Sequence, residues 1–286
     1  MKFFNIFSKD KKGYNDISQN IKIQNTVQVL NSTIANQIDQ DLIQLYLKNV
    51  NGDLLQITDQ KIISLHFAEY MSQQVKVINL QNCCGISFVK TPLNITELII
   101  NHSGLNQIDG IEQMTQLIKL DLRFNSIQDI TVLAKLIRLD CLYLCANSVN
   151  DLYPLMNLTT ITQLDISLNK ITNVNPISKL VHMRKLSISL NNIQNISAVQ
   201  NMLNLTDLDA IGNQLSDISP LRNLIQLQYL NLCPNNVQDI TPLTNLVSLI
   251  DLDIRNNNIH DFSPIQNHPN YKQYKWFTWA KPELCQ

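Results

Sequence analysis

The side chains with the clearest chemical potential are Cys141 and Cys145, which flank Tyr143 on one short segment. Two thiolates would supply half of a tetrahedral zinc site, which needs a third and a fourth ligand within reach. The positions 22 residues before and after Cys145 hold Arg123 and Ser167, and neither side chain is a usual zinc ligand. We therefore predict that no metal is bound.

No arrangement typical of catalysis is present in the sequence. The chain contains six glycines, and they form neither a phosphate-binding loop nor a dinucleotide fingerprint. The nucleophile elbow Gly-x-Ser-x-Gly is also absent. Five histidines occupy unrelated positions: His66, His102, His182, His260 and His268. We predict that the protein is not an enzyme and has no cofactor.

The cysteines and the net charge of the chain indicate where in the cell the protein is located and which partners it binds. Cys141 and Cys145 would lie about 13 Å apart along a strand at ~3.3 Å per residue, which exceeds the reach of a disulfide. Free thiols are typical of the cytoplasm, where we place the protein. The formal net charge of −1 argues against nucleic acid as a partner. No apolar run is long enough for a membrane span, and the apolar part of Met1–Lys12 is too short for a signal peptide.

An internal repeat positions all of these side chains. Seven asparagines recur every 22 residues: Asn125, Asn147, Asn169, Asn191, Asn213, Asn235 and Asn257. One period carries apolar residues at Leu117, Leu120, Leu122, Ile127, Ile130, Leu133 and Leu136. A fixed period of this length indicates a solenoid in which neighbouring coils share one core, because a single coil cannot bury its apolar face alone.

Each part of the period predicts a local structure. The alternation in Leu120-Asp121-Leu122 predicts a short strand with both leucines directed inward. The amide of Asn125 can donate and accept hydrogen bonds, so stacked asparagines should satisfy backbone groups buried in the turns. Apolar residues at every third position then favour 3₁₀ turns on the outer wall. Prolines recur in these turns: Pro154, Pro176, Pro220, Pro242 and Pro264.

The frame extends toward both ends of the chain. Ser103, Cys83 and Gln60 replace the asparagine in three earlier periods, so we expect about ten coils over residues 53–268. Residues 26–52 have the three- and four-residue spacing of an amphipathic helix, which we interpret as an N-terminal cap. Residues 1–25 are predicted to be a disordered tail, with a weak membrane-surface anchor as the alternative. Residues 269–286 are predicted to be an aromatic C-terminal cap, with an exposed binding patch as the alternative.

Two of the repeats carry closely similar segments, LSDISPL at Leu215–Leu221 and VQDITPL at Val237–Leu243. In these segments the repeats resemble those of the internalins and of the regulatory subunit of protein phosphatase one. This resemblance implies an α/β right-handed horseshoe solenoid with a parallel sheet on the concave face and 3₁₀ turns on the convex face. Internalins are secreted and carry a surface-attachment region, which is not visible here. Tyr271–Gln286 does not match the cap of the phosphatase subunit, so no phosphatase-binding residues are transferred.

The outward positions of the strands should form the binding surface. Three columns there carry seven acidic and four basic side chains, and aromatic and aliphatic residues are interspersed. The candidate partner-binding residues are Lys119, Asp121, Arg123, Phe124, Tyr143, Asp165, Lys185, Asp207, Asp209, Ile211, Tyr229, Asn231, Asp251, Asp253 and Arg255.

We predict a monomeric, non-catalytic protein-interaction module that grips a protein partner in the concave face. A regulatory subunit of a phosphatase or similar enzyme is one alternative, and a cell-surface adhesin or receptor-type repeat protein is the other.

Overall fold

The computed structural model describes residues 48–59, 75–86, 88 and 94–271. The chain divides into two compact units, Met1–Leu45 and Tyr46–Gln286, and the described residues all belong to the second. The predicted tail, residues 26–47 of the predicted helical cap and residues 272–286 of the predicted aromatic cap lie outside the described residues, as does Gln60.

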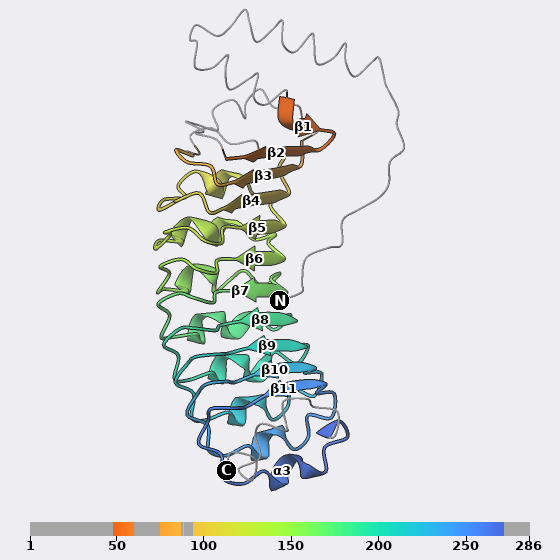
Figure 1. Cartoon of the computed structure of the whole chain (residues 1–286). Coiled ribbons are helices and arrows are strands. Elements are labelled where there is room, and N and C mark those ends of the chain that lie inside the picture. Colours follow the sequence, from red (N-terminus) through yellow and green to blue (C-terminus); the bar gives the residue numbers. More distant parts are fainter. Residues whose placement is uncertain (1–47, 60–74, 87, 89–93, 272–286) are drawn as a thin grey trace, which may run out of the picture. The chain divides into compact units, whose positions relative to one another are not determined.

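The described residues form one sheet of eleven strands that follow one another in chain order (Figure 1). The short β1 pairs with β2 in antiparallel fashion, and every later pair from β2 to β11 is parallel. The strands are β1 (Val50–Asn51), β2 (Leu54–Thr58), β3 (Val77–Gln81), β4 (Glu97–Asn101), β5 (Lys119–Asp121), β6 (Cys141–Tyr143), β7 (Gln163–Asp165), β8 (Lys185–Ser187), β9 (Asp207–Asp209), β10 (Tyr229–Asn231) and β11 (Asp251–Asp253). This arrangement confirms the predicted solenoid.

Short 3₁₀ turns form the wall opposite the sheet (Figure 1). They are η2 (Ile111–Gln113), η3 (Thr131–Lys135), η4 (Tyr153–Leu155), η5 (Asn175–Lys179), η6 (Ser197–Asn201), η7 (Ser219–Leu221) and η8 (Thr241–Leu243), followed by the helix α3 (Ser263–Gln266). Proline is the second residue of η4, η5, η7, η8 and α3. Its fixed φ suits the start of a turn, where its missing N–H is not needed.

The core lies between the sheet and the 3₁₀ wall. Leu120 and Leu122 are fully buried, and so are Leu133 and Leu136 from the turn that follows. The same positions are buried in the later coils, so the apolar frame of the repeat is the core of the protein. His268 takes a leucine position in the last coil and is also buried, with its ring nitrogen Nε2 against the carbonyl oxygen of Leu246.

The asparagines link adjacent coils, as Asn169 illustrates. Its Nδ2 donates to the carbonyl oxygen of Leu144 in the preceding coil at 2.9 Å, and to those of Ile166 and Ser167 in its own coil. Its Oδ1 accepts from the backbone N–H of Val149, also at 2.9 Å. One buried amide therefore satisfies four backbone groups, which confirms the predicted ladder.

The two described substitutes occupy the same place in the ladder. The hydroxyl of Ser103 accepts from the backbone N–H of Cys83 at 3.2 Å and donates to the carbonyl oxygen of Asn101. The thiol of Cys83 is buried and donates to the carbonyl oxygen of Ile57 at 3.6 Å. The ladder therefore continues beyond the asparagines toward the N-terminal end of the sheet.

Candidate functional site

The solvent side of β4 to β11 is called the sheet face here, and its residues align in columns as predicted. The parallel register places Lys119, Cys141, Gln163, Lys185 and Asp207 opposite one another on successive strands. The next column runs through Asp121, Tyr143, Asp165, Ser187, Asp209, Asn231 and Asp253. Side chains far apart in the sequence therefore lie one strand apart on this face.

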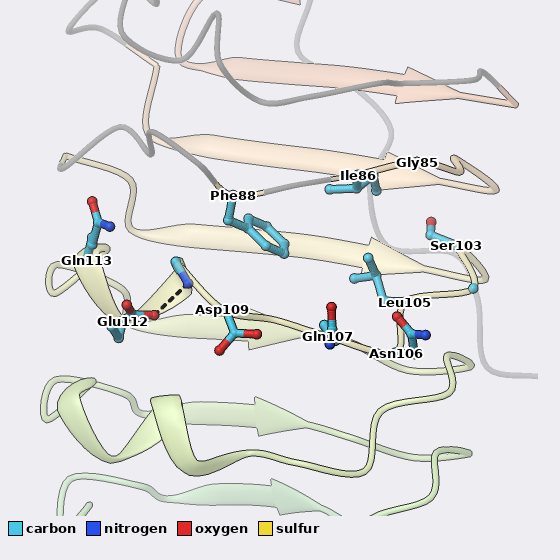
Figure 2. A pocket seen from close by; sticks show the side chains of 12 residues that line it. Gly85, Ile86, Phe88, Ser103, Leu105, Asn106, Gln107, Asp109, Glu112 and Gln113 are labelled. Atoms are coloured by element: carbon cyan, nitrogen blue, oxygen red, sulfur yellow. Dashed lines mark hydrogen bonds between the residues drawn. The ribbon is translucent and has the colours of Figure 1, made fainter.

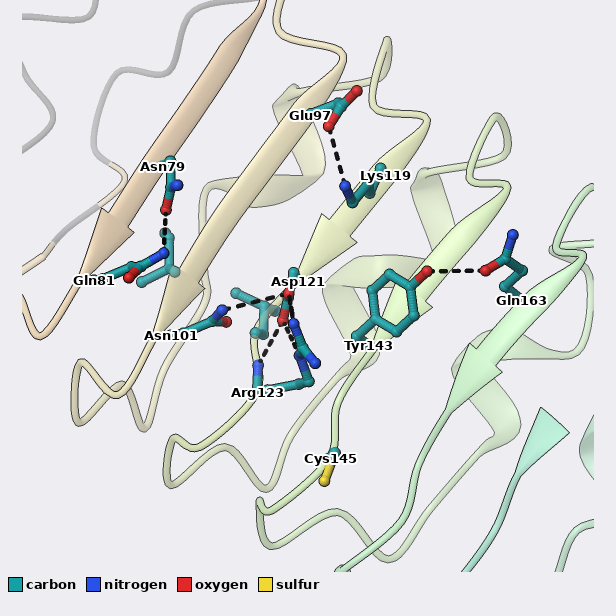
Figure 3. Close-up of polar contacts among 12 residues, drawn as sticks. Asn79, Gln81, Glu97, Asn101, Lys119, Asp121, Arg123, Tyr143, Cys145 and Gln163 are labelled. Atoms are coloured by element: carbon teal, nitrogen blue, oxygen red, sulfur yellow. Dashed lines mark hydrogen bonds and ion pairs between the residues drawn. The ribbon is translucent and has the colours of Figure 1, made fainter. Parts of the chain in front are cut away.

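A cluster around Arg123 organises the N-terminal part of the sheet face (Figure 3). Asp121 is 2% exposed, and its carboxylate accepts two hydrogen bonds from Nε of Arg123 and one from Nη2 at 2.6 Å. The guanidinium carbon of Arg123 also lies 5.4 Å from the centre of the Tyr143 ring. Asp121 is therefore too buried to contact a partner directly, and its role among the predicted residues is to orient Arg123.

The C-terminal end of the face repeats this pair in a more exposed setting. Nη2 of Arg255 lies 2.5 Å from Oδ2 of Asp253, and its Nε donates to Oδ1 at 2.9 Å. Burial raises the pKa of Asp253, but the hydrogen bonds from Arg255 outweigh it and lower that pKa overall. The carboxylate is thus held in its charged form beside Arg255.

Between these two pairs the sheet face contains a hollow of about 330 Å³, which we call the tyrosine hollow. Tyr143 on β6 and Tyr229 on β10 lie at its two ends. The hydroxyl of Tyr143 donates to Oε1 of Gln163 at 3.0 Å, and Nδ2 of Asn231 donates to the hydroxyl of Tyr229 at 3.2 Å. The residues that line the hollow between them are Gln163, Leu164, Asp165, Lys185, Leu186, Ser187, Asp207 and Asp209. Both rings are therefore oriented by neighbours on the same face.

The tyrosine hollow is acidic. Asp165, Asp207 and Asp209 contribute three carboxylates against the single ammonium group of Lys185. The amine of Lys185 lies 3.8 Å from Oδ1 of Asp207, and both side chains are substantially exposed, so this ion pair is weak. The pKa of Asp209 is raised overall, mainly by burial and in smaller part by the nearby charge of Asp165. Hydrogen bonds from Ser189 and the Ile211 amide act in the opposite direction but do not cancel the rise.

An apolar row borders the sheet face where the strands end. Phe124, Leu168 and Leu190 recur at the repeat period and are 44–47% exposed. All three have a φ of 54–57°, the left-handed region that is strained for such side chains. In the next coil Gly212 takes this position with a φ of 61°, and a Cβ there would meet the Leu190 side chain at 2.6 Å. The row therefore exposes apolar groups on a strained but regular backbone.

The structure also reveals features that were not in the predicted set. Gln163 and Ser187 line the tyrosine hollow, and their column positions were the sequence signal that could have identified them. A second apolar row, at the approach to the strands, consists of Ile137, Val181, Leu203, Ile225 and Val247, which are 38–64% exposed. Its 22-residue spacing is visible in the sequence as well.

A second pocket, of about 520 Å³, lies on the loops that follow β3 and β4 and on η2 (Figure 2). Its walls include Phe88, Leu105 and Asp109, and Glu112 accepts a hydrogen bond from the backbone N–H of Gly110 at 2.7 Å.

The cysteines in the described part of the chain are not in a cluster of metal ligands. Within the described ranges, no three His, Cys, Asp or Glu side chains are grouped as a metal site. Burial raises the pKa values of the Cys141 and Cys145 thiols, which favours the neutral form of both. Cys84, Cys141, Cys145 and Cys233 do not form disulfides. None of the helices in the described part of the chain is long and apolar enough to cross a membrane.

The stacked 22-residue coils, the asparagine ladder and the parallel sheet define a leucine-rich repeat protein. The chain is similar to internalin C2 from Listeria monocytogenes, with 34% identity over 62% of this chain and 78% of that one and a TM-score of 0.59. A second Listeria monocytogenes internalin (inlF) is 26% identical over 91% of this chain and 81% of that one, with a TM-score of 0.65. The chain belongs to the leucine-rich repeat proteins of the internalin type.

A more distant likeness shows the fold alone. The leucine-rich repeat ectodomain of a plant membrane receptor kinase from Arabidopsis thaliana, solved in complex with CASPARIAN STRIP INTEGRITY FACTOR 2, is 21% identical. That match covers 72% of this chain and 27% of the receptor, with a TM-score of 0.61. No protein-family model and no curated protein sequence matches this chain.

Proposed function

We propose that this protein is a non-catalytic interaction module that binds a protein partner on its sheet face. The observation that carries the proposal is the tyrosine hollow, in which two half-buried aromatic rings frame an open depression that holds three carboxylates. Binding energy at protein interfaces concentrates in such aromatic anchors, while the surrounding contacts mainly exclude water. The exposed row of Phe124, Leu168 and Leu190 adds apolar area at the border of the sheet face.

The related structures support an interaction role. Leucine-rich repeat proteins are in general binding modules, and the plant receptor ectodomain was solved with a bound factor. The adhesin or receptor alternative draws support from the same likeness to internalins and to a receptor ectodomain. No observation favours the phosphatase subunit. The monomeric state, the cytoplasmic location and the absence of nucleic acid from the partners stay predictions.

Tyrosine substitutions test the proposal. We expect Tyr143→Ala and Tyr229→Ala each to weaken partner binding by about 30-fold, or ~2 kcal/mol, because each removes an aromatic anchor. The measurement is capture of partner proteins from native lysate by the immobilised full chain, followed by affinity determination for the captured protein. Tyr153→Ala is the matched control, since Tyr153 is 60% exposed on the 3₁₀ wall. Unchanged capture by both sheet-face variants, with their unfolding curves intact, would contradict the proposal.

A further inference from the structure

The tyrosine hollow is shaped and charged for one particular kind of group. Its volume of about 330 Å³ is at the lower end of the range for small-molecule pockets, roughly 300–1,000 Å³. It is also an open depression on a sheet, so a bound group must enter from the solvent side. These dimensions suit a single long side chain of a partner protein better than a complete small-molecule ligand.

The excess of negative charge in the hollow favours the binding of a cation. Three carboxylates face one ammonium group, which leaves a formal balance of −2. The backbone N–H and the hydroxyl of Ser167 both donate to Oδ1 of Asp165. Within the described part of the chain, Oδ2 of Asp165 accepts no hydrogen bond. Burial raises the pKa of Asp209 above its ordinary value even though Ser189 and the Ile211 amide hydrogen-bond to its carboxylate, and the charge of Asp165 adds to the rise.

The chain already displays the arrangement that such a cation would adopt. On one side of Tyr143, the guanidinium of Arg123 lies over the ring at 5.4 Å and forms a fork with the carboxylate of Asp121 (Figure 3). Gln163, one of the residues of the hollow, lies on the other side of Tyr143. A guanidinium can stack on an aromatic ring and pair with carboxylates at the same time, which an ammonium group does less well.

We propose that the tyrosine hollow receives an arginine side chain of the protein partner. The aliphatic stem lies against Tyr143 or Tyr229, and the guanidinium pairs with Asp165 and Asp209 above Ser187. Lys185 keeps its exposed pairing with Asp207, which leaves these two carboxylates for the incoming group. This inference rests on the proposed function, because it names the chemistry of the partner that the sheet face binds.

Two peptides that differ by one charge test the inference. The full chain, isotope-labelled, is titrated by NMR with acetyl-Gly-Arg-Gly-amide and with the same peptide carrying citrulline, the neutral isostere of arginine. The arginine peptide should shift the backbone amide signals of β7, β8 and β9 in a saturable manner in the millimolar range. The citrulline peptide should bind at least about tenfold more weakly, since it lacks the charge that the carboxylates recognise.

Variants locate the effect in the hollow. Asp165→Asn and Asp209→Asn keep the side-chain shape and should each weaken binding of the arginine peptide about tenfold. Glu97→Gln removes a carboxylate from β4 on the same face, outside the hollow, and should leave binding unchanged. The amide spectrum of each variant confirms that it is folded.

Three results would overturn the inference: equal binding of the two peptides, no shift with either, or aspartate variants that bind like the parent protein. Its failure can be told apart from failure of the proposed function. If Tyr143→Ala releases the partner while arginine and citrulline peptides behave alike, the sheet face binds a protein but not through an arginine.

Discussion

At the residue scale, the asparagine side chain makes the same set of hydrogen bonds in every central coil. Each of these side chains donates to carbonyl oxygens of its own coil and of the preceding coil, and it accepts from the backbone N–H two residues after the preceding ladder asparagine. The pattern holds for Asn147, Asn169, Asn191 and Asn213. Asparagine suits this position because it is short and both donates and accepts. Its recurrence therefore reflects the fold, and the specific chemistry of the protein lies in the columns of the sheet face.

Replacing one amide of the ladder tests this assignment. Asn169→Ala should lower the free energy of unfolding by about 3 kcal/mol, because it leaves buried backbone groups such as the Val149 N–H without partners. Chemical denaturation of the full chain measures the change. Asn157→Ala is the control, since Asn157 is exposed and its loss should cost less than about 0.5 kcal/mol. Equal effects of the two substitutions would show that the ladder does not hold the coils.

At the element scale, each coil from β5 to β10 combines a three-residue strand, a ladder turn and a 3₁₀ turn. These could be predicted from the sequence because their signals are local: alternation around Leu120, a fixed asparagine, and apolar residues at every third position. The column register could also be predicted, since parallel strands of equal spacing must align. The burial of Asp121 beneath Arg123 could not, because it depends on side-chain packing across β5 and β6.

The tyrosine hollow was only partly predictable. Tyr143, Asp165, Asp209 and Tyr229 were among the expected site residues, and the structure brings them around one depression. The depression itself depends on the relative sizes of neighbouring side chains, because Ser187 is small and its neighbours are larger. The order of residues in each column does not show how deep the surface is at that point. The left-handed φ at Phe124, Leu168 and Leu190 was also missed, since glycine usually signals that conformation.

Two leucines in one coil test the distinction between frame and surface. Leu205 is fully buried and Leu203 is 54% exposed, only two residues away. Leu205→Ala should cost about 2–5 kcal/mol through lost contacts and a cavity. Leu203→Ala should cost less than about 0.5 kcal/mol, because its side chain already meets water. Urea unfolding of both variants checks this, and similar losses would mean that the second apolar row contributes to the core.

At the scale of the described unit, the repeat separates stability from recognition. Core leucines and ladder asparagines recur from coil to coil, whereas the columns on the sheet face change from strand to strand. Lys119 pairs with Glu97 near the N-terminal end of the sheet, at 3.3 Å, while the acidic tyrosine hollow lies on β6 to β10. This division allows the binding surface to vary without loss of the shared core.

The central claim is that a protein partner binds the sheet face, and photo-crosslinking tests it most directly. A photoreactive phenylalanine derivative replaces Lys185 on β8 in one variant and Lys179 at the end of η5 in the other. Both lysines are exposed, and they lie on opposite walls of neighbouring coil segments. After illumination in native lysate, a crosslinked partner should form at position 185 and not at position 179. Crosslinking at position 179 alone, or equally at both, would contradict the account.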